Sequence, residues 1–144
     1  MSTFKVFDIA GSGMAAQSVR INTVASNLAN ANSVSGDPGK VYRARHPVFE
    51  AVRGAVGGAP GAARAEASAA VRVAGIVEAD TPAMARYEPG NPLADPNGYV
   101  YAPNVNVVEE MVDMISASRS YQNNVEVMNT SKDMLLATLR LGQS

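Results

Sequence analysis

The most regular hydrophobic pattern lies in the last third of the chain, between Val105 and Gly142, where apolar residues recur at alternating spacings of three and four. The nine positions of this pattern are Met111, Met114, Ser118, Tyr121, Val125, Met128, Lys132, Leu135 and Leu139. Seven of the nine are apolar in a chain that is 47% hydrophobic. A stripe with this period predicts one long amphipathic helix that packs against another helix.

The same spacing predicts a shorter helix at the start of the chain. Its positions are Phe4, Phe7, Gly11, Met14, Ser18, Ile21, Ala25, Leu28 and Asn32. We expect this helix to begin near Thr3 and to end between Asn30 and Ser33, because the turn residues at 36–39 (GDPG) cannot continue it. Little sequence lies between the two helices to cover both, which favours a protein that packs against copies or relatives of itself.

The middle of the chain has a weaker, β-type pattern. Residues 40–52 have partial strand character, and Pro47 restricts them to an edge or a bent strand. Residues 54–70 are rich in glycine and alanine and are predicted to form a flexible loop. The clearest strand runs from Ala70 to Ala79, and its expected partner is the segment from Ala83 to Tyr87.

Together these patterns predict an α+β chain in three parts. They are an N-terminal helix at 1–33, a β-rich middle segment at 34–104 that contains the Gly/Ala-rich loop 54–70, and a C-terminal helix at 105–144. Asn106 and Glu109 resemble a capping box, and Gly142 is the expected end of the second helix.

Composition limits the functions that this chain can have. Its length of 144 residues allows a modest core, and an aromatic content of 6% without tryptophan argues against a large one. A net charge of −1 argues against nucleic acid or an anionic membrane as a partner. The absence of cysteine excludes disulfides and thiol chemistry. No apolar run predicts a membrane-spanning helix or a cleaved signal peptide.

The residues that could carry chemistry have simpler explanations. The acidic cluster Glu109, Glu110 and Asp113 could form a metal site or an acid–base pair, but helix N-termini favour acids for electrostatic reasons alone. His46 is the single histidine and cannot anchor a usual zinc site. The segment 11–13 (GSG) lacks the strand, lysine and third glycine of a nucleotide-binding loop. We therefore predict no catalytic residue, no metal, no cofactor and no enzymatic activity.

Asparagines crowd the end of the first helix, although asparagine is a poor residue in a helix interior. They mark either a fraying helix end or a row of amides that bond a neighbouring subunit and fix its register. On the second interpretation they join the apolar stripes in a predicted subunit-packing surface. Its residues are Phe4, Phe7, Met14, Ile21, Asn27, Leu28, Asn30, Met111, Met114, Tyr121, Val125, Met128, Leu135 and Leu139.

Five short segments carry recognisable motifs. They are 7–14 (FDIAGSGM), 26–32 (SNLANAN), 95–100 (DPNGYV), 103–113 (PNVNVVEEMVD) and 116–122 (SASRSYQ). Together they resemble one protein family, the axial proteins of the bacterial flagellar rod and hook. The last three are similar to the proximal rod proteins of the basal body. The Gly/Ala-rich loop contains no matching motif.

This resemblance implies a structural subunit that polymerises across the periplasm into a hollow drive shaft, which transmits torque and passes exported subunits. The terminal helices would pair as a coiled coil lining the tube, with the β-rich segment outside. The implied partners are copies of the chain, other rod proteins, the flagellar type III export apparatus and neighbouring basal-body rings, without membrane insertion. Export would need no cleaved signal peptide, and Phe4 and Phe7 would help the export gate recognise the subunit.

Two other interpretations stay open at this point. Another rod or hook-type axial protein is the first, although the short middle segment argues against a hook protein with large outer domains. A free-standing coiled-coil adaptor is the second, and such an adaptor would be helical and oligomeric in dilute solution.

Overall fold

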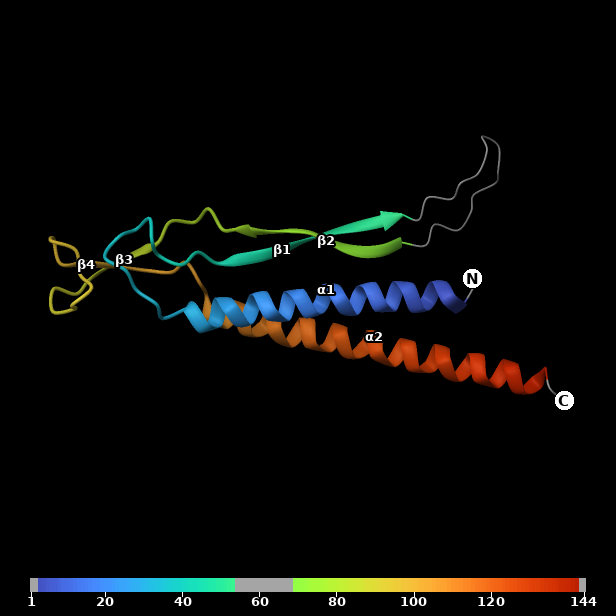
Figure 1. Cartoon of the computed structure of the whole chain (residues 1–144). Helices are drawn as coiled ribbons and strands as arrows, with labels where there is room; N and C mark the ends of the chain where they lie inside the picture. Colours follow the sequence, from blue (N-terminus) through green and yellow to red (C-terminus); the bar gives the residue numbers. More distant parts are fainter. Residues whose placement is uncertain (1–2, 54–68, 143–144) are drawn as a thin grey trace, which may run out of the picture.

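The computed structural model describes residues 3–53 and 69–142, which form an elongated α+β molecule (Figure 1). Two long helices open and close the chain, and four strands lie between them in two antiparallel pairs. The elements are α1 (Thr3–Asn30), β1 (Arg45–Arg53), β2 (Ala69–Glu78), β3 (Met84–Tyr87), β4 (Tyr99–Ala102) and α2 (Val107–Leu141).

Both helices have the bounds that the periodicity predicts. Asn106 caps α2, because its side-chain oxygen accepts a hydrogen bond from the N–H of Val108 at 3.1 Å. Glu109 and Glu110 lie in the first turn, where negative charge is stabilised by the helix dipole. At the other end the N–H of Gly142 donates to the carbonyl oxygen of Thr138. Within the described residues, neither helix is both long and apolar enough to cross a membrane.

The strand predicted at 70–79 is confirmed as β2, but its predicted pairing with the segment at 83–87 is wrong. β2 pairs with β1 over nine residue pairs, from Arg45 opposite Glu78 to Arg53 opposite Ala69, with an irregularity at Val48/Phe49. β3, the expected partner of β2, pairs instead with β4 over four residue pairs. The physical reason is length, because four residues cannot cover the ten-residue β2 and the nine residues of β1 can.

The predicted Gly/Ala-rich loop, residues 54–70, overlaps the start of β2. Residues 54–68 lie outside the described part of the chain, while Ala69 and Ala70 belong to β2. Pro47 lies within β1, where it is tolerated because both strands of a two-stranded sheet are edge strands.

α1 is the central layer of the molecule. It lies between the β1–β2 hairpin and α2 (Figure 1). Among the described residues it contacts both neighbours, which do not contact each other. The two helices run in opposite directions, so that the start of α1 and the end of α2 lie at one end of the molecule and the β3–β4 pair lies at the other.

The core is thin and is built mainly from small side chains. Its buried apolar residues are Ala10, Ala16, Val24, Val41, Ala44, Val100 and Ala117. The largest side chains that are fully buried are Val100 and Asn27. Most large apolar side chains therefore keep contact with solvent.

The β3–β4 pair is held to the end of α1 by a close backbone approach. Ser35 and Tyr101 exchange two backbone hydrogen bonds, at 2.8 and 3.0 Å. Beside them, a Cβ atom on Gly36 would lie 2.5 Å from the carbonyl oxygen of Leu93. Glycine at 36 thus lets two backbone segments touch.

We predict that Gly36→Ala lowers the free energy of unfolding by about 1–3 kcal/mol, because the added methyl group must displace backbone. Gly90→Ala is the matched control, since a Cβ at Gly90 would meet nothing within 4 Å. Urea unfolding of the purified full chain measures both. Equal stability of the two variants would contradict the close approach at residue 36.

Candidate assembly interface

The contact between α1 and α2 is made by polar and small residues. On α1, Gly13 and Asn27 are two heptads apart and face α2. The Nδ2 group of Asn27 donates to Oε1 of Glu110 at 2.9 Å. A Cβ atom on Gly13 would lie 2.9 Å from Nδ2 of Asn124. These two pairs fix the antiparallel register of the helices.

Arg20, midway between Gly13 and Asn27 on α1, adds an ion pair to the same contact. Its Nη2 atom lies 2.8 Å from Oδ1 of Asp113, and the two side chains are 25% and 46% exposed. A pair this accessible to solvent stabilises the helix contact only modestly, by about 0–1 kcal/mol. The ion pair therefore helps to select the register of the two helices more than it stabilises their contact.

The buried side of α2 repeats every seven residues. Glu110, Ala117 and Ser131 are 6%, 0% and 4% exposed, and Asn124 occupies the same repeat. The small Ala117 permits close contact at the middle of the helix pair. We call this row, together with Gly13, Arg20 and Asn27 of α1, the polar seam.

The apolar stripes predicted from the sequence lie beside the polar seam rather than in it. On α2, Met111, Tyr121 and Leu139 are exposed, at 55%, 39% and 61%. Of the other predicted positions, Asn27 is buried. The half-buried ones are Phe7, Met14, Ile21, Leu28, Asn30, Met114, Val125, Met128 and Leu135. The side chain of Phe4 lies outside the described part of the structure.

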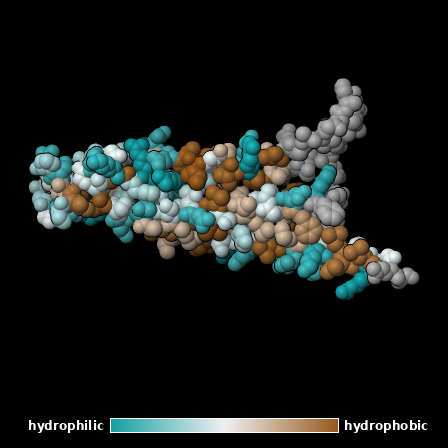
Figure 2. Space-filling view, viewed as in Figure 1, coloured by the Kyte–Doolittle hydropathy of each residue, from teal (hydrophilic) through white to brown (hydrophobic). Residues whose placement is uncertain are grey.

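A rotation of about one residue around α2 explains this arrangement. The predicted stripe contains Met111, Ser118 and Val125, whereas the repeat that faces α1 contains the preceding residues 110, 117 and 124, of which 110 and 117 are buried. One residue corresponds to about 100° of helix rotation. The large apolar side chains are therefore only partly covered by the fold of the single chain. Figure 2 shows hydrophobic side chains at the molecular surface along much of its length.

The side-chain amide of Asn27 links α1 to α2, to β1 and to the segment before β1, and all its hydrogen-bonding groups have partners. Its Nδ2 group donates to the carbonyl oxygen of Arg45 at 2.8 Å and to Glu110 at 2.9 Å. Its Oδ1 atom accepts from the N–H of Arg45 at 2.9 Å and from the hydroxyl of Tyr42 at 2.8 Å. The side chain is 0% exposed. All four hydrogen bonds that an asparagine can make are formed within the chain, so none is left for a neighbouring subunit.

Asn104 provides a second junction, which the sequence analysis did not single out. Its Oδ1 atom accepts from the N–H of Ala44 at 2.8 Å, and its Nδ2 group donates to the carbonyl oxygen of Thr81 at 2.8 Å. It thereby ties the segments before β1 and after β2 to the start of α2. The signal that could have identified it is its place in the PNVN segment at 103–106.

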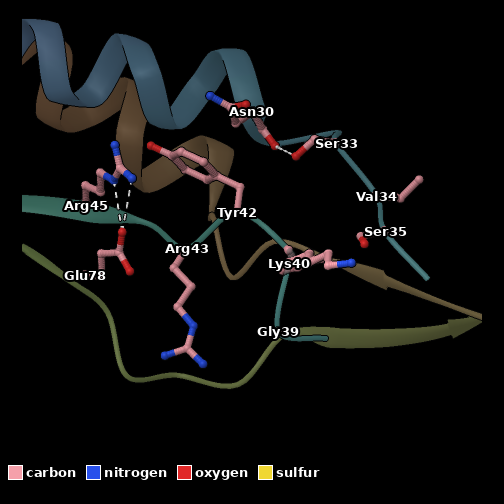
Figure 3. A pocket seen from close by; sticks show the side chains of 11 residues that line it. Asn30, Ser33, Val34, Ser35, Gly39, Lys40, Tyr42, Arg43, Arg45 and Glu78 are labelled. Carbon is pink, nitrogen blue, oxygen red and sulfur yellow. Dashed lines mark hydrogen bonds and ion pairs between the residues drawn. The ribbon is translucent and has the colours of Figure 1, made fainter. Parts of the chain in front are cut away.

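A polar cleft of about 650 Å³ lies where α1 ends and β1 begins (Figure 3). Arg45 and Glu78 form an exposed ion pair at its wall, with a nitrogen–oxygen distance of 3.1 Å. Arg43 and Lys40 are exposed beside it. His46 is exposed on β1, and the described residues contain no group of three acidic or histidine side chains that could hold a metal ion.

The structure therefore has the features of a structural assembly subunit: an elongated shape, a thin core, a polar helix contact, and large apolar side chains left at the surface. Comparisons with known protein families agree with this class. Residues 7–36 match the family described as flagella basal body rod protein, and residues 97–141 match the flagellar basal body rod FlgEFG protein C-terminal family.

Curated relatives extend the match to the whole chain. The flagellar basal-body rod protein FlgC of Salmonella typhimurium is 56% identical over 143 residues, which cover 99% of this chain and 100% of that protein. FlgC of Yersinia enterocolitica is 52% identical with the same coverage, and FlgC of Aquifex aeolicus is 41% identical over 96% of each chain. The chain thus belongs to the FlgC family of flagellar basal-body rod proteins, which are structural proteins rather than enzymes.

We predict that Asn27→Ala lowers the free energy of unfolding by about 2–3 kcal/mol, because Glu110 and the Arg45 backbone lose their partner in a buried place. Asn22→Ala, on the exposed side of the same helix, should change it by less than about 0.5 kcal/mol. Urea unfolding followed by circular dichroism measures both. Similar small losses in the two variants would show that the Asn27 network does not hold the fold together.

Proposed function

We propose that this chain is a structural subunit of the proximal rod of the bacterial flagellum. In this role copies polymerise into a hollow helical drive shaft across the periplasm, which transmits torque and passes exported subunits. Family membership supports the rod assignment, and the observation that carries the assembly mechanism is the incomplete burial of the apolar stripes on both helices. A chain that leaves these side chains in water gains free energy when neighbours cover them.

The proposed assembly uses the terminal helices as a coiled coil that lines the tube. The antiparallel contact of α1 and α2 supports this arrangement, as does the small and polar character of their contact. Each large apolar side chain that becomes fully buried contributes about 1.5–3 kcal/mol. In the three-part organisation, residues 1–33 and 105–144 form the axial helices and residues 34–104 face outward.

The residues proposed to pack against neighbouring subunits are those of the predicted stripes that keep some exposure. They are Phe7, Met14, Ile21, Leu28, Met111, Met114, Tyr121, Val125, Met128, Leu135 and Leu139. Contacts that do not close on themselves extend a helical tube instead of ending at a dimer. The proposed partners are therefore copies of this chain and other rod proteins.

Export and anchoring are the remaining parts of the proposal. The subunit leaves the cytoplasm through the flagellar type III apparatus without signal cleavage, and Phe4 and Phe7 are proposed to help the export gate recognise it. Neighbouring basal-body rings are proposed as further contacts of the finished rod.

We predict that Leu135→Asp abolishes swimming while leaving export intact, because it places a charge in the half-buried stripe that neighbours would cover. Thr138→Asp adds the same charge at an exposed position one turn away and should preserve swimming. Swimming is scored on soft agar, and the exported protein is quantified by immunoblot. Normal swimming of the Leu135→Asp strain would exclude the packing role of this stripe.

Electron microscopy of basal bodies tests the function itself. A strain that lacks only this gene should contain rings without a completed rod or hook, and the intact chain should restore both. Complete basal bodies and normal swimming in the deletion strain would overturn the rod assignment.

A further inference from the structure

The connection between β3 and β4 ends in a tight turn at 95–98 (DPNG). The N–H of Gly98 donates to the carbonyl oxygen of Asp95 at 2.9 Å, which closes the four-residue turn. Neither Pro96 nor Asn97 has a positive φ, and no peptide bond among the described residues is cis. A closed turn with these properties is a type I turn, and aspartate, proline and glycine occupy the positions that this type prefers.

The Asn97–Gly98 pair in this turn is the one Asn-Gly sequence in the chain, and such a pair is prone to deamidation. Asn97 is exposed, and no described residue forms a hydrogen bond with its side chain. Because glycine has no Cβ atom, its backbone nitrogen can approach the side-chain amide carbon of the preceding asparagine. The nitrogen loses its proton and attacks that carbon, a C–N bond closes a succinimide ring, and ammonia leaves. Water then opens the ring to give aspartate or isoaspartate.

The fold requires the glycine of this reactive pair. Gly98 has a φ of +81°, which side-chain-bearing residues rarely adopt. A Cβ atom at this position would lie 3.0 Å from Cε2 of Tyr87 and 3.2 Å from Cβ of Pro89. The carbonyl oxygen of Gly98 also accepts a hydrogen bond from the N–H of Glu88 at 2.9 Å. The turn therefore keeps a glycine directly after the exposed asparagine.

Asp95 holds the turn closed through both its side chain and its backbone. Its Oδ1 atom accepts from the N–H groups of Asn97 and Tyr99, each at 2.8 Å. Its own N–H donates to the carbonyl oxygen of Tyr99 at 2.8 Å. Together with the bond from Gly98, these contacts fix the peptide groups on both sides of the glycine.

The closed turn has the wrong geometry for succinimide formation. In a type I turn the third residue, here Asn97, has a ψ of about 0°. At this angle the Gly98 nitrogen is eclipsed with the backbone nitrogen of Asn97, whereas ring closure requires it to be eclipsed with the Cβ atom. The peptide between the two residues must therefore rotate, and this breaks the hydrogen bond from Gly98 to Asp95. The proton that must leave the nitrogen is held in the same bond.

We propose that Asn97 is a deamidation site that the Asp95 turn keeps unreactive in the folded chain and that reacts when the turn opens. The rate then follows the population of the open turn, as amide hydrogen exchange does. Isoaspartate adds a methylene group to the backbone, and aspartate adds a negative charge near Asp95. The modification thus records that the β3–β4 end of a chain has been open. This inference goes beyond the proposed function and does not depend on it.

A comparison of the folded and the unfolded full chain tests the site. The purified chain is incubated at one temperature and one mildly alkaline pH, in buffer or in guanidinium chloride, and circular dichroism verifies each state. Samples are digested at acidic pH, where succinimide formation is slow, and liquid chromatography with mass spectrometry separates the three forms of the peptide that contains residue 97. We expect amide loss to be at least about tenfold slower in the folded chain, with both acid forms present.

Each other outcome of this comparison contradicts one part of the proposal. Equal rates in the two states would overturn the protection by the turn. A lack of deamidation in the unfolded chain would overturn the site itself. Formation of aspartate without isoaspartate would overturn the succinimide route, since water can open that ring at either carbonyl.

Two substitutions of Asp95 test what holds the turn closed. Asp95→Ala removes the Oδ1 acceptor and should accelerate amide loss at residue 97 in the folded chain by about fivefold or more. Asp95→Asn is the matched control, because its amide oxygen can accept the same two hydrogen bonds, and it should react at the rate of the unchanged chain. Since Pro96 has no N–H, asparagine at position 95 cannot itself form a succinimide with the next residue.

Equal rates for the two folded variants would exclude the carboxylate of Asp95 as the group that keeps the turn closed. Hydrogen exchange of the Gly98 amide in the unchanged chain gives a second measurement, which stands even if Asp95→Ala does not fold. This amide should exchange at least about tenfold more slowly than in the unfolded chain. Exchange at the unfolded rate would overturn the proposal.

Discussion

The fold of this chain depends on one buried amide, that of Asn27. Its four hydrogen bonds join α1 to the start of α2, to the backbone of β1 and to the tyrosine that precedes β1. The apolar core is too thin to determine by itself how these elements are oriented, because alanines and a few valines pack without strong directional preference. Hydrogen bonds are directional, and a polar group buried without its partners is costly. The amide therefore determines which arrangement of the helices and the hairpin is stable.

The polar seam also explains why the two helices keep their apolar stripes at the surface. A helix pair that buried both stripes would leave few apolar side chains exposed for contacts with other subunits. Here Glu110, Ala117 and Ser131 occupy the contact instead. Residues on one side of each helix thus stabilise the single chain, and residues on another side stay available to neighbours.

The bounds of an element could be predicted from the sequence where local signals determine them. The bounds of α1 and α2 followed from hydrophobic period, from Asn106 as a cap and from the turn after α1. The pairing of β2 could not be predicted, because β1 and β2 are separated by residues 54–68 and pairing depends on distant segments of matching length. The role of Asn104 was missed for a similar reason, since its partners lie 23 to 60 residues away in the sequence. The hydrophobic period located the apolar stripes, but it could not show which side of each helix is buried against the rest of the same chain.

The proline and the irregularity in β1 have a consequence for how copies can meet. Both strands of the hairpin are edges, and an exposed edge of regular backbone can recruit a strand from another molecule. Pro47 removes one backbone donor from β1, and the register shift at Val48/Phe49 interrupts the regular ladder. Two ion pairs across the hairpin, Arg45 with Glu78 and Arg72 with Glu50, add charge to the same strands. These features disfavour continuous sheets between the hairpins of different copies, the arrangement found in cross-β aggregates.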